Sequence, residues 1–157
     1  MDNKMTRREV REVAFMVLFQ MEFRSDVNID DTVRQYYTMG GENTDEDDND
    51  ESQTVKLSPA DRKYIEEIAE GVKEHKKEID DIIAEFAKGW TVERLIKVDA
   101  AALRYGIFEM KYMQDKTPPE VCINEAVEIS KKYGTEKSKA FVNGVLSSYY
   151  KQLKGIC

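Results

Sequence analysis

Residues 121–146 read VCINEAVEISKKYGTEKSKAFVNGVL, and they combine two short amphipathic helical patterns with a joint between them. Gly134 interrupts the periodicity, and glycine is the residue that most often ends a helix. Lysines flank the joint on both sides. The stretch therefore predicts a helix that ends at Tyr133, a basic joint, and a last helix over residues 136–153. Gly144 lies inside that last helix, which predicts the close approach of a neighbouring helix there.

Helical periodicity extends through the rest of the chain, whereas the alternation typical of strands is nearly absent. One helix start is well marked, because Ser58 stands at an N-cap position and Pro59 at the first helical position. We expect an all-α fold, a compact bundle of about seven helices in a single domain over residues 1–157. The helices that precede the quoted stretch are expected over residues 6–23, 29–39, from 59 onward, 77–88, 91–96 and 98–112.

The acidic balance of the chain comes from one segment. The formal net charge is −7, and residues 40–53 contain seven acidic residues and no basic one. Residues 131–157 contain six lysines and one acid, so this end of the chain is basic. Residues 40–53 hold no apolar side chain whose burial could offset the entropy of ordering, and we expect a disordered acidic loop. A calcium loop is excluded, because Asp50 and Lys56 stand where glycine and glutamate are required.

The residue types needed for catalysis are nearly missing. His75 is the only histidine and lies in a polar stretch, which argues against multi-histidine metal sites and histidine-based triads. No phosphate-binding loop, dinucleotide fingerprint or nucleophile elbow occurs, so we expect no catalytic residue, no cofactor and no metal. The two cysteines are expected to be free thiols. Without a recognisable leader or membrane-spanning run, the chain is expected in the cytoplasm and not at a membrane.

The first predicted helix carries arginines and aromatic rings on one face. Helical spacing places Phe15 and Phe19 on this face. Arg8 and Arg11 share it, and the apolar stripe around Val17 lies opposite. Arginines neutralise phosphates and aromatic rings stack on unpaired bases, so this face predicts a surface for single-stranded nucleic acid. The alternative is a helix that is buried on both faces.

The joint between the last two helices combines the same residue types. Four lysines and two aromatic residues surround it: Lys131, Lys132, Lys137, Lys139, Tyr133 and Phe141. This surface suits single-stranded RNA better than duplex DNA, because no helix rich in Arg, Asn and Gln is present to read a groove. The alternative is that Phe141 is a core residue and the lysines form a solvated rim.

Four stretches of the chain carry specific motifs. They are an arginine-rich start that leads into Leu-Phe-Gln, a central run from Trp90, the motif INEAVE and the motif FVNGVL, at residues 7–20, 90–110, 123–128 and 141–146. With these motifs the chain resembles the NusB family of transcription antitermination factors, except over the acidic segment. It departs from the family pattern at Glu9, which interrupts the arginine run, and at Ala100, which follows Asp99.

The resemblance implies a fold of two small helical subdomains and binding of the single-stranded boxA element of leader and ribosomal RNA. It also implies a partner, the small-subunit ribosomal protein that acts as NusE, within the transcription elongation complex. Carried over to this sequence, the family's RNA surface comprises Arg7, Arg8, Arg11, Phe19, Tyr133, Lys137 and Phe141. We add Phe15 and Lys139, because they lie within the same two basic and aromatic patches.

Two functions of different classes remain open at this point. The first is an RNA-binding antitermination factor that acts on rRNA operon transcripts. The second is a helical protein-interaction module or homodimer without RNA binding. Salt dependence separates them, because phosphate contacts weaken steeply with salt and an apolar protein interface need not.

Overall fold

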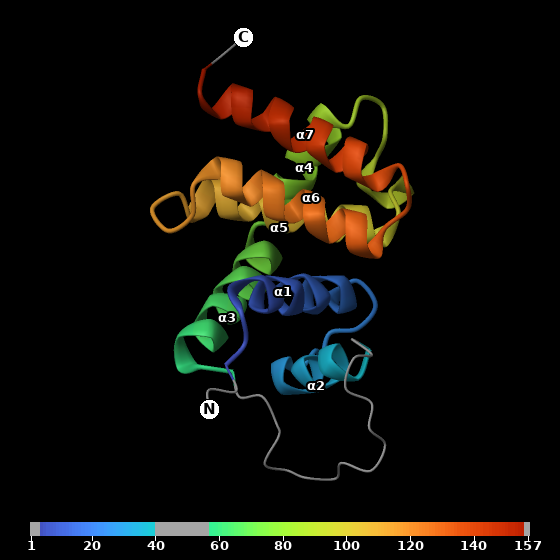
Figure 1. The fold of residues 1–157 in the computed structure, drawn as a ribbon. Coiled ribbons are helices and arrows are strands. Elements are labelled where there is room, and N and C mark those ends of the chain that lie inside the picture. The colour runs from blue at the N-terminus through green and yellow to red at the C-terminus, as the bar shows by residue number, and fades with distance from the viewer. Residues whose placement is uncertain (1–3, 40–56, 156–157) are drawn as a thin grey trace. The chain divides into compact units, whose positions relative to one another are not determined.

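The computed structural model describes residues 4–39 and 57–155, and Figure 1 shows its helices. In chain order they are α1 (Arg7–Met21), α2 (Ile29–Met39), α3 (Pro59–Glu74), α4 (Lys76–Phe86), the 3₁₀ turn η2 (Val92–Arg94), α5 (Lys97–Tyr112), α6 (Pro119–Tyr133) and α7 (Ser138–Leu153). For this part of the chain the all-α prediction is confirmed. The acidic loop expected at 40–53 lies outside the described residues. No described helix is both long and apolar enough to cross a bilayer.

The chain divides into two compact units, Met1–Glu67 and Ile68–Cys157. The first unit contains α1 and α2, and the second contains α4 to α7. The helix α3 begins in the first unit and ends in the second. This division agrees with the two small subdomains that the resemblance implies.

In the first unit, α1 begins at a capping box. The Thr6 hydroxyl accepts a hydrogen bond from the Glu9 amide (3.1 Å), and the Glu9 carboxylate accepts one from the Thr6 amide (2.9 Å). Glu9 therefore has a structural role in the arginine run that it interrupts. The apolar stripe is confirmed, because Val10 and Val17 are 1% and 2% exposed. The helix ends at Met21 and not at residue 23 as expected.

Two tyrosines of α2 bind the carboxylates of α1. The Tyr37 hydroxyl donates a hydrogen bond to Glu9 Oε2 (3.1 Å), and the Tyr36 hydroxyl donates one to Glu12 Oε2. Burial raises the pKa of Tyr37 above its ordinary value, and the neighbouring Glu9 carboxylate raises it further. Tyr37 is therefore a neutral hydrogen-bond donor at neutral pH.

The start of α3 that the sequence predicts at Ser58 and Pro59 is confirmed. Pro59 is the first helical residue, and the Asp61 amide donates a hydrogen bond to Ser58 Oγ (3.1 Å). The serine thus satisfies one of the amides that a helix leaves unpaired at its first turn.

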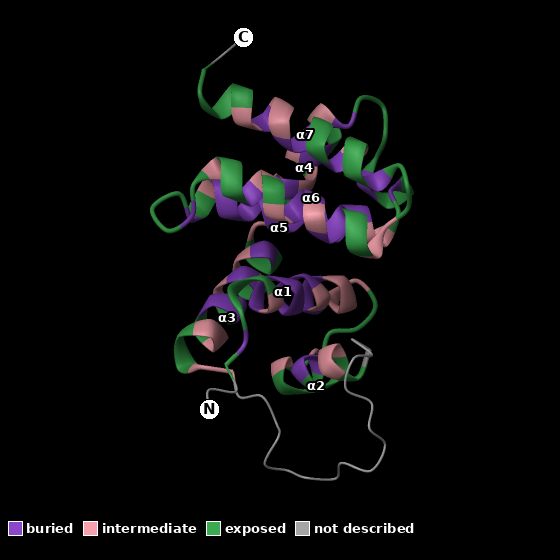
Figure 2. Cartoon of the chain, in the orientation of Figure 1, coloured by how far each residue is buried: buried purple, intermediate pink, exposed green. Residues whose placement is uncertain are grey.

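In the second unit, α5 is the central helix, and Figure 2 shows it buried along most of its length. It packs against α4, α6 and α7. Where α5 meets α7, a Cβ on Gly106 would lie 2.9 Å from Leu146 Cδ1, so glycine permits the contact. The close approach expected at Gly144 is wrong. A Cβ there would meet no atom within 4 Å, because Gly144 lies on the exposed side of α7.

A charge pair joins α4 to α5. Arg104 donates from Nε and Nη2 to the two carboxylate oxygens of Asp80, at 2.8 and 3.1 Å. The side chain of Arg104 is 7% exposed, so both of these hydrogen bonds are largely shielded from water. A guanidinium that binds a carboxylate through two parallel bonds fixes the orientation of both groups, and here it fixes the two helices at that point.

The remaining helix ends differ from expectation by a few residues. The helix α4 spans Lys76–Phe86 instead of 77–88, and the chain then passes through Lys88 and Gly89 with φ of 45° and 94°. The helix α7 begins at Ser138 instead of residue 136, because the two preceding residues form a turn. Helix ends are where local signals are weakest, since the terminal turn depends on what caps it.

Candidate RNA-binding surfaces

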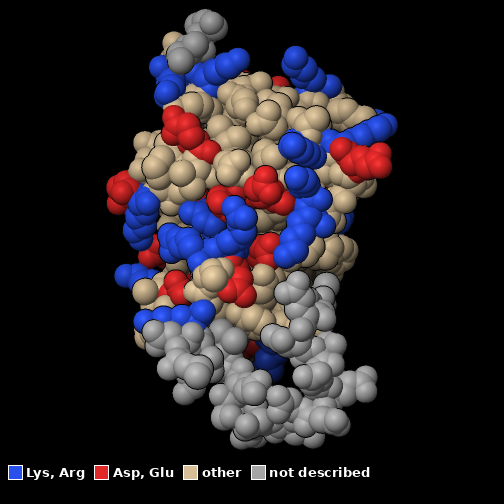
Figure 3. Space-filling model, viewed as in Figure 1, with Lys and Arg blue, Asp and Glu red and all other residues tan. Residues whose placement is uncertain are grey.

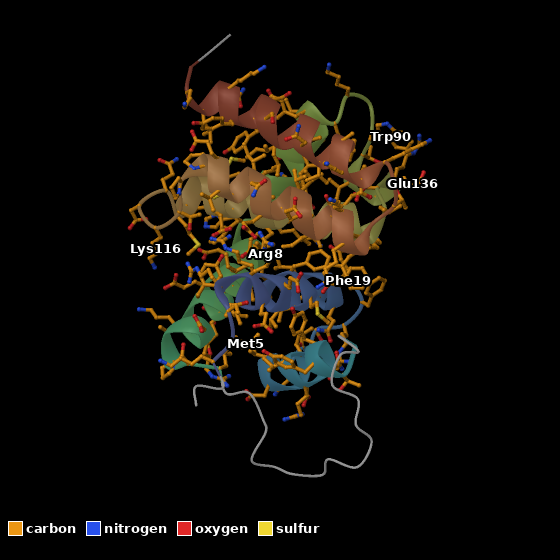
Figure 4. All side chains as sticks on the ribbon, viewed as in Figure 1. Met5, Arg8, Phe19, Trp90, Lys116 and Glu136 are labelled. Atoms are coloured by element: carbon orange, nitrogen blue, oxygen red, sulfur yellow. The ribbon has the colours of Figure 1, made fainter. Side chains whose placement is uncertain are left out.

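The first candidate surface is the start of α1. The capping box places Arg7 and Arg8 in the first turn, and both residues are exposed. Figure 4 labels Arg8 at this end of the helix. Cations in a first turn oppose the helix dipole, so the charges of these arginines do not stabilise α1 through that dipole. Their exposure and charge suit them to contact phosphates.

Tyr64 of α3 holds two of the arginines in place. The Cζ atom of Arg7 lies 4.9 Å from the centroid of the Tyr64 ring, and that of Arg11 lies 5.9 Å from it. Both distances are within the cation–π range. Arg11 is only 3% exposed, so its expected place beside the exposed face of α1 is wrong. Sequence spacing could not reveal this contact, because Tyr64 belongs to a helix far along the chain.

Three phenylalanines form a ladder, Phe15 and Phe19 within α1 and Phe23 just after its end. The rings of Phe15 and Phe19 stack with centroids 6.2 Å apart, and Phe19 meets Phe23 edge to face at 5.3 Å. Exposure rises along the ladder, from 2% at Phe15 to 63% at Phe23. Phe15 is therefore a core side chain, as the alternative for this helix predicts, whereas Phe19 keeps part of its ring accessible. Sequence analysis missed Phe23, although its i, i+4 spacing from Phe19 is the signal that could have found it.

The second candidate surface is the joint between α6 and α7. Lys137 and Lys139 are exposed there, and Tyr133 and Phe141 are half-buried. The Nζ atom of Lys132 lies 5.3 Å from the centroid of the Tyr133 ring. Figure 3 shows lysine and arginine side chains over α6 and the start of α7. Phe141 lies outside the buried face of α7, so its ring is partly accessible and is not a core residue.

Ser138 organises this joint. Its hydroxyl accepts a hydrogen bond from the Thr135 amide (2.9 Å), and its own amide donates to the Thr135 carbonyl (3.1 Å). Gly134 is required beside it, because a Cβ would lie 2.4 Å from Ser138 Oγ and 2.6 Å from the Ser130 carbonyl oxygen. Gly134 follows α6 directly, as expected, but its φ is −98°. The turn therefore uses the missing side chain of Gly134 and not a left-handed backbone.

His75, the single histidine of the chain, is not one of the residues of either candidate surface. His75 stacks on the ring of Tyr112 at 4.3 Å and lies 3.6 Å from Glu78 Oε2. Among residues 4–39 and 57–155, no group of three or more His, Cys, Asp or Glu side chains could hold a metal ion. Cys122 is buried, and its thiol lies 3.9 Å from the Thr117 carbonyl oxygen.

Comparison with known proteins identifies the family of this chain. The model of the NusB family matches residues 8–151. The chain belongs to the NusB family. A transcription antitermination protein NusB from Agathobacter rectalis is 38% identical over 145 residues, which cover 92% of this chain and 99% of that relative. The resemblance drawn from the four motifs is thereby confirmed.

Solved structures of NusB proteins have a similar fold. The structure of T. maritima NusB matches with a TM-score of 0.73 and 33% identity, and the match covers 95% of this chain and 93% of that one. A crystal structure of antitermination factors NusB and NusE in complex with dsRNA matches with a TM-score of 0.69 and 28% identity. That match covers 93% of this chain and 96% of the other. The roles of single residues on the two surfaces stay predictions.

Proposed function

We propose that this chain is an RNA-binding transcription antitermination factor. It binds boxA-type single-stranded RNA of rRNA operon transcripts together with the ribosomal protein NusE. The observation that carries the proposal is the match to the NusB family over residues 8–151, with a relative that is named a transcription antitermination protein. The NusB family is non-enzymatic, so the surfaces described above serve binding and not catalysis.

A solved relative supports the choice of partners. In that crystal structure NusB and NusE are in complex with dsRNA. We therefore assign RNA and the ribosomal protein as partners of this chain, and we place the assembly in the transcription elongation complex. The ribosomal protein supplies contacts of its own, which raises the affinity of the assembly for RNA above that of this chain alone.

The side chains of the two surfaces favour a single strand over a duplex. Phe19, Tyr133 and Phe141 each leave part of a ring accessible. Unpaired bases stack on such rings, whereas the bases of an A-form duplex stack on one another and present only their edges. A single strand can therefore use both the rings and the cations, but a duplex can use only the cations.

Each side chain has a specific part in this proposal. Phosphate contacts belong to the exposed cations, which are Arg7, Arg8, Lys137 and Lys139. Base stacking belongs to the partly accessible rings, which are Phe19, Tyr133 and Phe141. Arg11 and Phe15 act indirectly because both are buried: Arg11 packs beside Tyr64, and Phe15 stacks against Phe19.

The test is a titration of fluorescently labelled boxA RNA with the full chain, with and without NusE, at several salt concentrations. We expect log K to fall linearly with log salt, with a slope of about −0.7 for each phosphate contact on a single strand. The ribosomal protein is expected to increase RNA affinity through a coupling of about 1–3 kcal/mol. The same RNA annealed to its complement is the control and is expected to bind more weakly.

A protein-interaction module or homodimer without RNA binding predicts the opposite results. In that case the chain would bind NusE, or would self-associate in analytical ultracentrifugation, while the RNA signal stayed at background. If no RNA binding is detected either with or without NusE, the proposed function is wrong.

A further inference from the structure

The start of α1 carries two cations where the helix itself disfavours them. Thr6 caps the helix, and residues 6–9 form its first turn, the arginine turn, in which Arg7 and Arg8 are the first two helical residues. The helix dipole is positive at this end, so two cations there favour fraying of the turn. The arginine turn therefore depends on other groups to hold it closed.

Glu9 closes the arginine turn. Its Oε1 accepts a hydrogen bond from the Thr6 amide at 2.9 Å, and its own amide donates to the Thr6 hydroxyl at 3.1 Å. Arg7 and Arg8 lie between these two residues, so the capping box fixes the backbone on both sides of them. The acid that interrupts the arginine run thus holds the turn that carries two of the arginines.

The second carboxylate oxygen of Glu9 is bound by another helix. Tyr37, near the end of α2, donates from its hydroxyl to Glu9 Oε2 at 3.1 Å. Figure 1 shows α1 and α2 beside each other, and the two helices are in contact within the first unit. The half-buried Tyr37 ring meets the ring of Tyr36 edge to face at 5.2 Å. With a donor on each oxygen the Glu9 carboxylate has a fixed orientation, so the capping box is anchored to α2.

A second contact holds the arginine turn from α3. The Arg7 Cζ atom lies 4.9 Å from the centroid of the Tyr64 ring, which is within the cation–π range. Arg8 is exposed and is next to Glu9 in the chain, so the direction in which it leaves the helix follows from the same capped turn. Of the two arginines, Arg8 is therefore the better reporter of the anchor at Glu9.

We propose that Tyr37 is a positioning residue for RNA binding, which holds the Glu9 carboxylate and, through it, the arginine turn. Tyr37 acts through Glu9 and does not itself contact the RNA. The inference rests on the proposed function, because it requires that Arg8 contacts RNA. It gives a part in RNA binding to α2, a helix that carries none of the side chains assigned to the two surfaces.

The sign of the effect separates positioning from simple electrostatics. If Glu9 acted only through its charge, Glu9→Ala and Glu9→Gln would strengthen RNA binding equally, because each removes a negative charge beside the arginines. Positioning predicts a weaker complex for Glu9→Ala, because the arginine turn loses both its capping box and its anchor. Glutamine keeps an oxygen for the Thr6 amide and a donor for the Tyr37 hydroxyl oxygen. Glu9→Gln is therefore expected to bind RNA more tightly than Glu9→Ala.

The experiment measures the affinity of boxA RNA in the presence of NusE for Tyr37→Phe, which removes one hydroxyl and leaves every charge in place. We expect binding to weaken about fivefold, which corresponds to about 1 kcal/mol. Tyr36→Phe is the matched control. It removes the hydroxyl of the neighbouring tyrosine, which donates to Glu12 of α1, beyond the arginine turn. It loosens the same pair of helices but keeps the anchor at Glu9, so RNA affinity is expected to stay unchanged in folded protein.

Hydrogen exchange of the Glu9 amide tests the anchor without RNA. This amide donates to the Thr6 hydroxyl, so its exchange rate reports how often the capping box opens. Measured by NMR, exchange is expected to be faster in Tyr37→Phe than in Tyr36→Phe and the unchanged chain. Equal exchange rates in all three proteins would show that Tyr37 does not hold the arginine turn.

A double-mutant cycle with Arg8 links the anchor to RNA. Arg8→Ala is expected to weaken RNA binding in the unchanged chain and to have a smaller effect when Tyr37→Phe is also present. Residues that act through one shared structure are non-additive in this way, whereas a general loss of stability leaves the two effects additive. Additive effects, or an equal loss of RNA affinity in Tyr36→Phe, would overturn the positioning role.

The failure of this inference can be told apart from failure of the proposed function. If Arg8→Ala leaves RNA affinity unchanged, the proposed RNA role of the arginine turn is wrong, and the positioning role is wrong with it. If Arg8→Ala weakens binding while Tyr37→Phe and Glu9→Ala do not, only the positioning role is wrong. Should Glu9→Ala fail to fold, Tyr37→Phe and its cycle with Arg8→Ala decide the question in the same way.

Discussion

Phe15 and Phe19 lie one turn apart on the same stripe of α1 and differ in accessibility. Phe15 is 2% exposed, and Phe19 is half-buried between its two neighbours in the ladder. A ring that is buried stabilises the fold through the area it removes from water, and a ring with an open face can also bind a ligand. The two residues therefore separate the structural part of the aromatic stripe from the part proposed to bind RNA.

Alanine at these two positions is expected to reduce stability in one case and RNA affinity in the other. Phe15→Ala should lower the free energy of unfolding by about 3–5 kcal/mol, because it leaves a cavity in the core. Phe19→Ala should cost about 1–3 kcal/mol of RNA affinity, the usual effect of removing the ring on which a base stacks. Denaturant unfolding and RNA titration of both variants measure this. If Phe19→Ala reduced stability and left RNA affinity unchanged, the stacking role would be wrong.

Arg7 and Arg8 are expected to act on RNA through charge. The double variant Arg7→Ala with Arg8→Ala should flatten the slope of log K against log salt by about 0.7 for each phosphate that the arginines no longer neutralise. Its melting temperature should fall only slightly, because cations in a first turn oppose the helix dipole and the cation–π contact of Arg7 with Tyr64 contributes only about 0.5–1 kcal/mol. Arg34→Ala is the matched control, since Arg34 is an exposed arginine of α2 that pairs with Asp31. An unchanged slope in the double variant would contradict the phosphate role.

Packing between helices depends on small residues whose positions are specific to this fold. Gly106 lies where α5 meets α7, next to Leu146, which is itself fully buried. Gly144 lies in the middle of α7 and faces open space. The same residue type thus permits a close contact between helices at one position and only weakens the helix at the other.

Alanine at the two glycines is expected to change stability in opposite directions. Gly106→Ala should lower the free energy of unfolding by about 1–3 kcal/mol, because the surrounding core cannot absorb a further methyl group. Gly144→Ala should raise it by about 0.5–1 kcal/mol, because alanine is the better helix former and meets no neighbour. Chemical unfolding of both variants measures whether the free energy of unfolding falls for Gly106→Ala and rises for Gly144→Ala. A destabilised Gly144→Ala variant would show that the exposed side of α7 is constrained in the folded chain.

Over the whole molecule, the charges are segregated along the chain. The formal net charge is −7, and the seven acidic residues of 40–53 account for its magnitude. The other segments include a basic C-terminal stretch that contains the α6–α7 joint. Negative charges on the same chain compete with RNA phosphates for the cationic side chains. The acidic segment is therefore expected to weaken RNA binding.

Deleting residues 41–52 removes these seven acids and takes the formal net charge from −7 to zero. We expect stronger RNA binding at low salt and a smaller gain at high salt, because the Debye length falls to about 8 Å at physiological ionic strength. The melting temperature is expected to stay the same. A Gly/Ser segment of equal length is the control for chain length, and it should give the same gain as the deletion. Equal RNA affinity in all three forms at low salt would show that the acidic segment does not act on RNA.

Much of the candidate RNA-binding surface could be predicted from residue type. The exposed positions of Arg8, Lys137 and Lys139 follow from charge and helical spacing, because burying an unpaired cation is unfavourable. Arg11 and Phe15 could not be predicted in the same way. Both lie on the expected face of α1, but the extent to which that face is covered depends on side chains from elsewhere in the chain.

The helices themselves could be known from the sequence, because their determinants are local. A helix hydrogen bond joins residues four apart, and a cap acts within the first turn. Thr6 with Glu9 therefore marks the start of α1 without reference to the rest of the chain, and Ser58 with Pro59 marks the start of α3. Which glycine meets a neighbouring helix was decided by tertiary packing. The close approach of Gly106 to Leu146 joins two helices that are well separated in sequence, and no periodicity within either helix contains it.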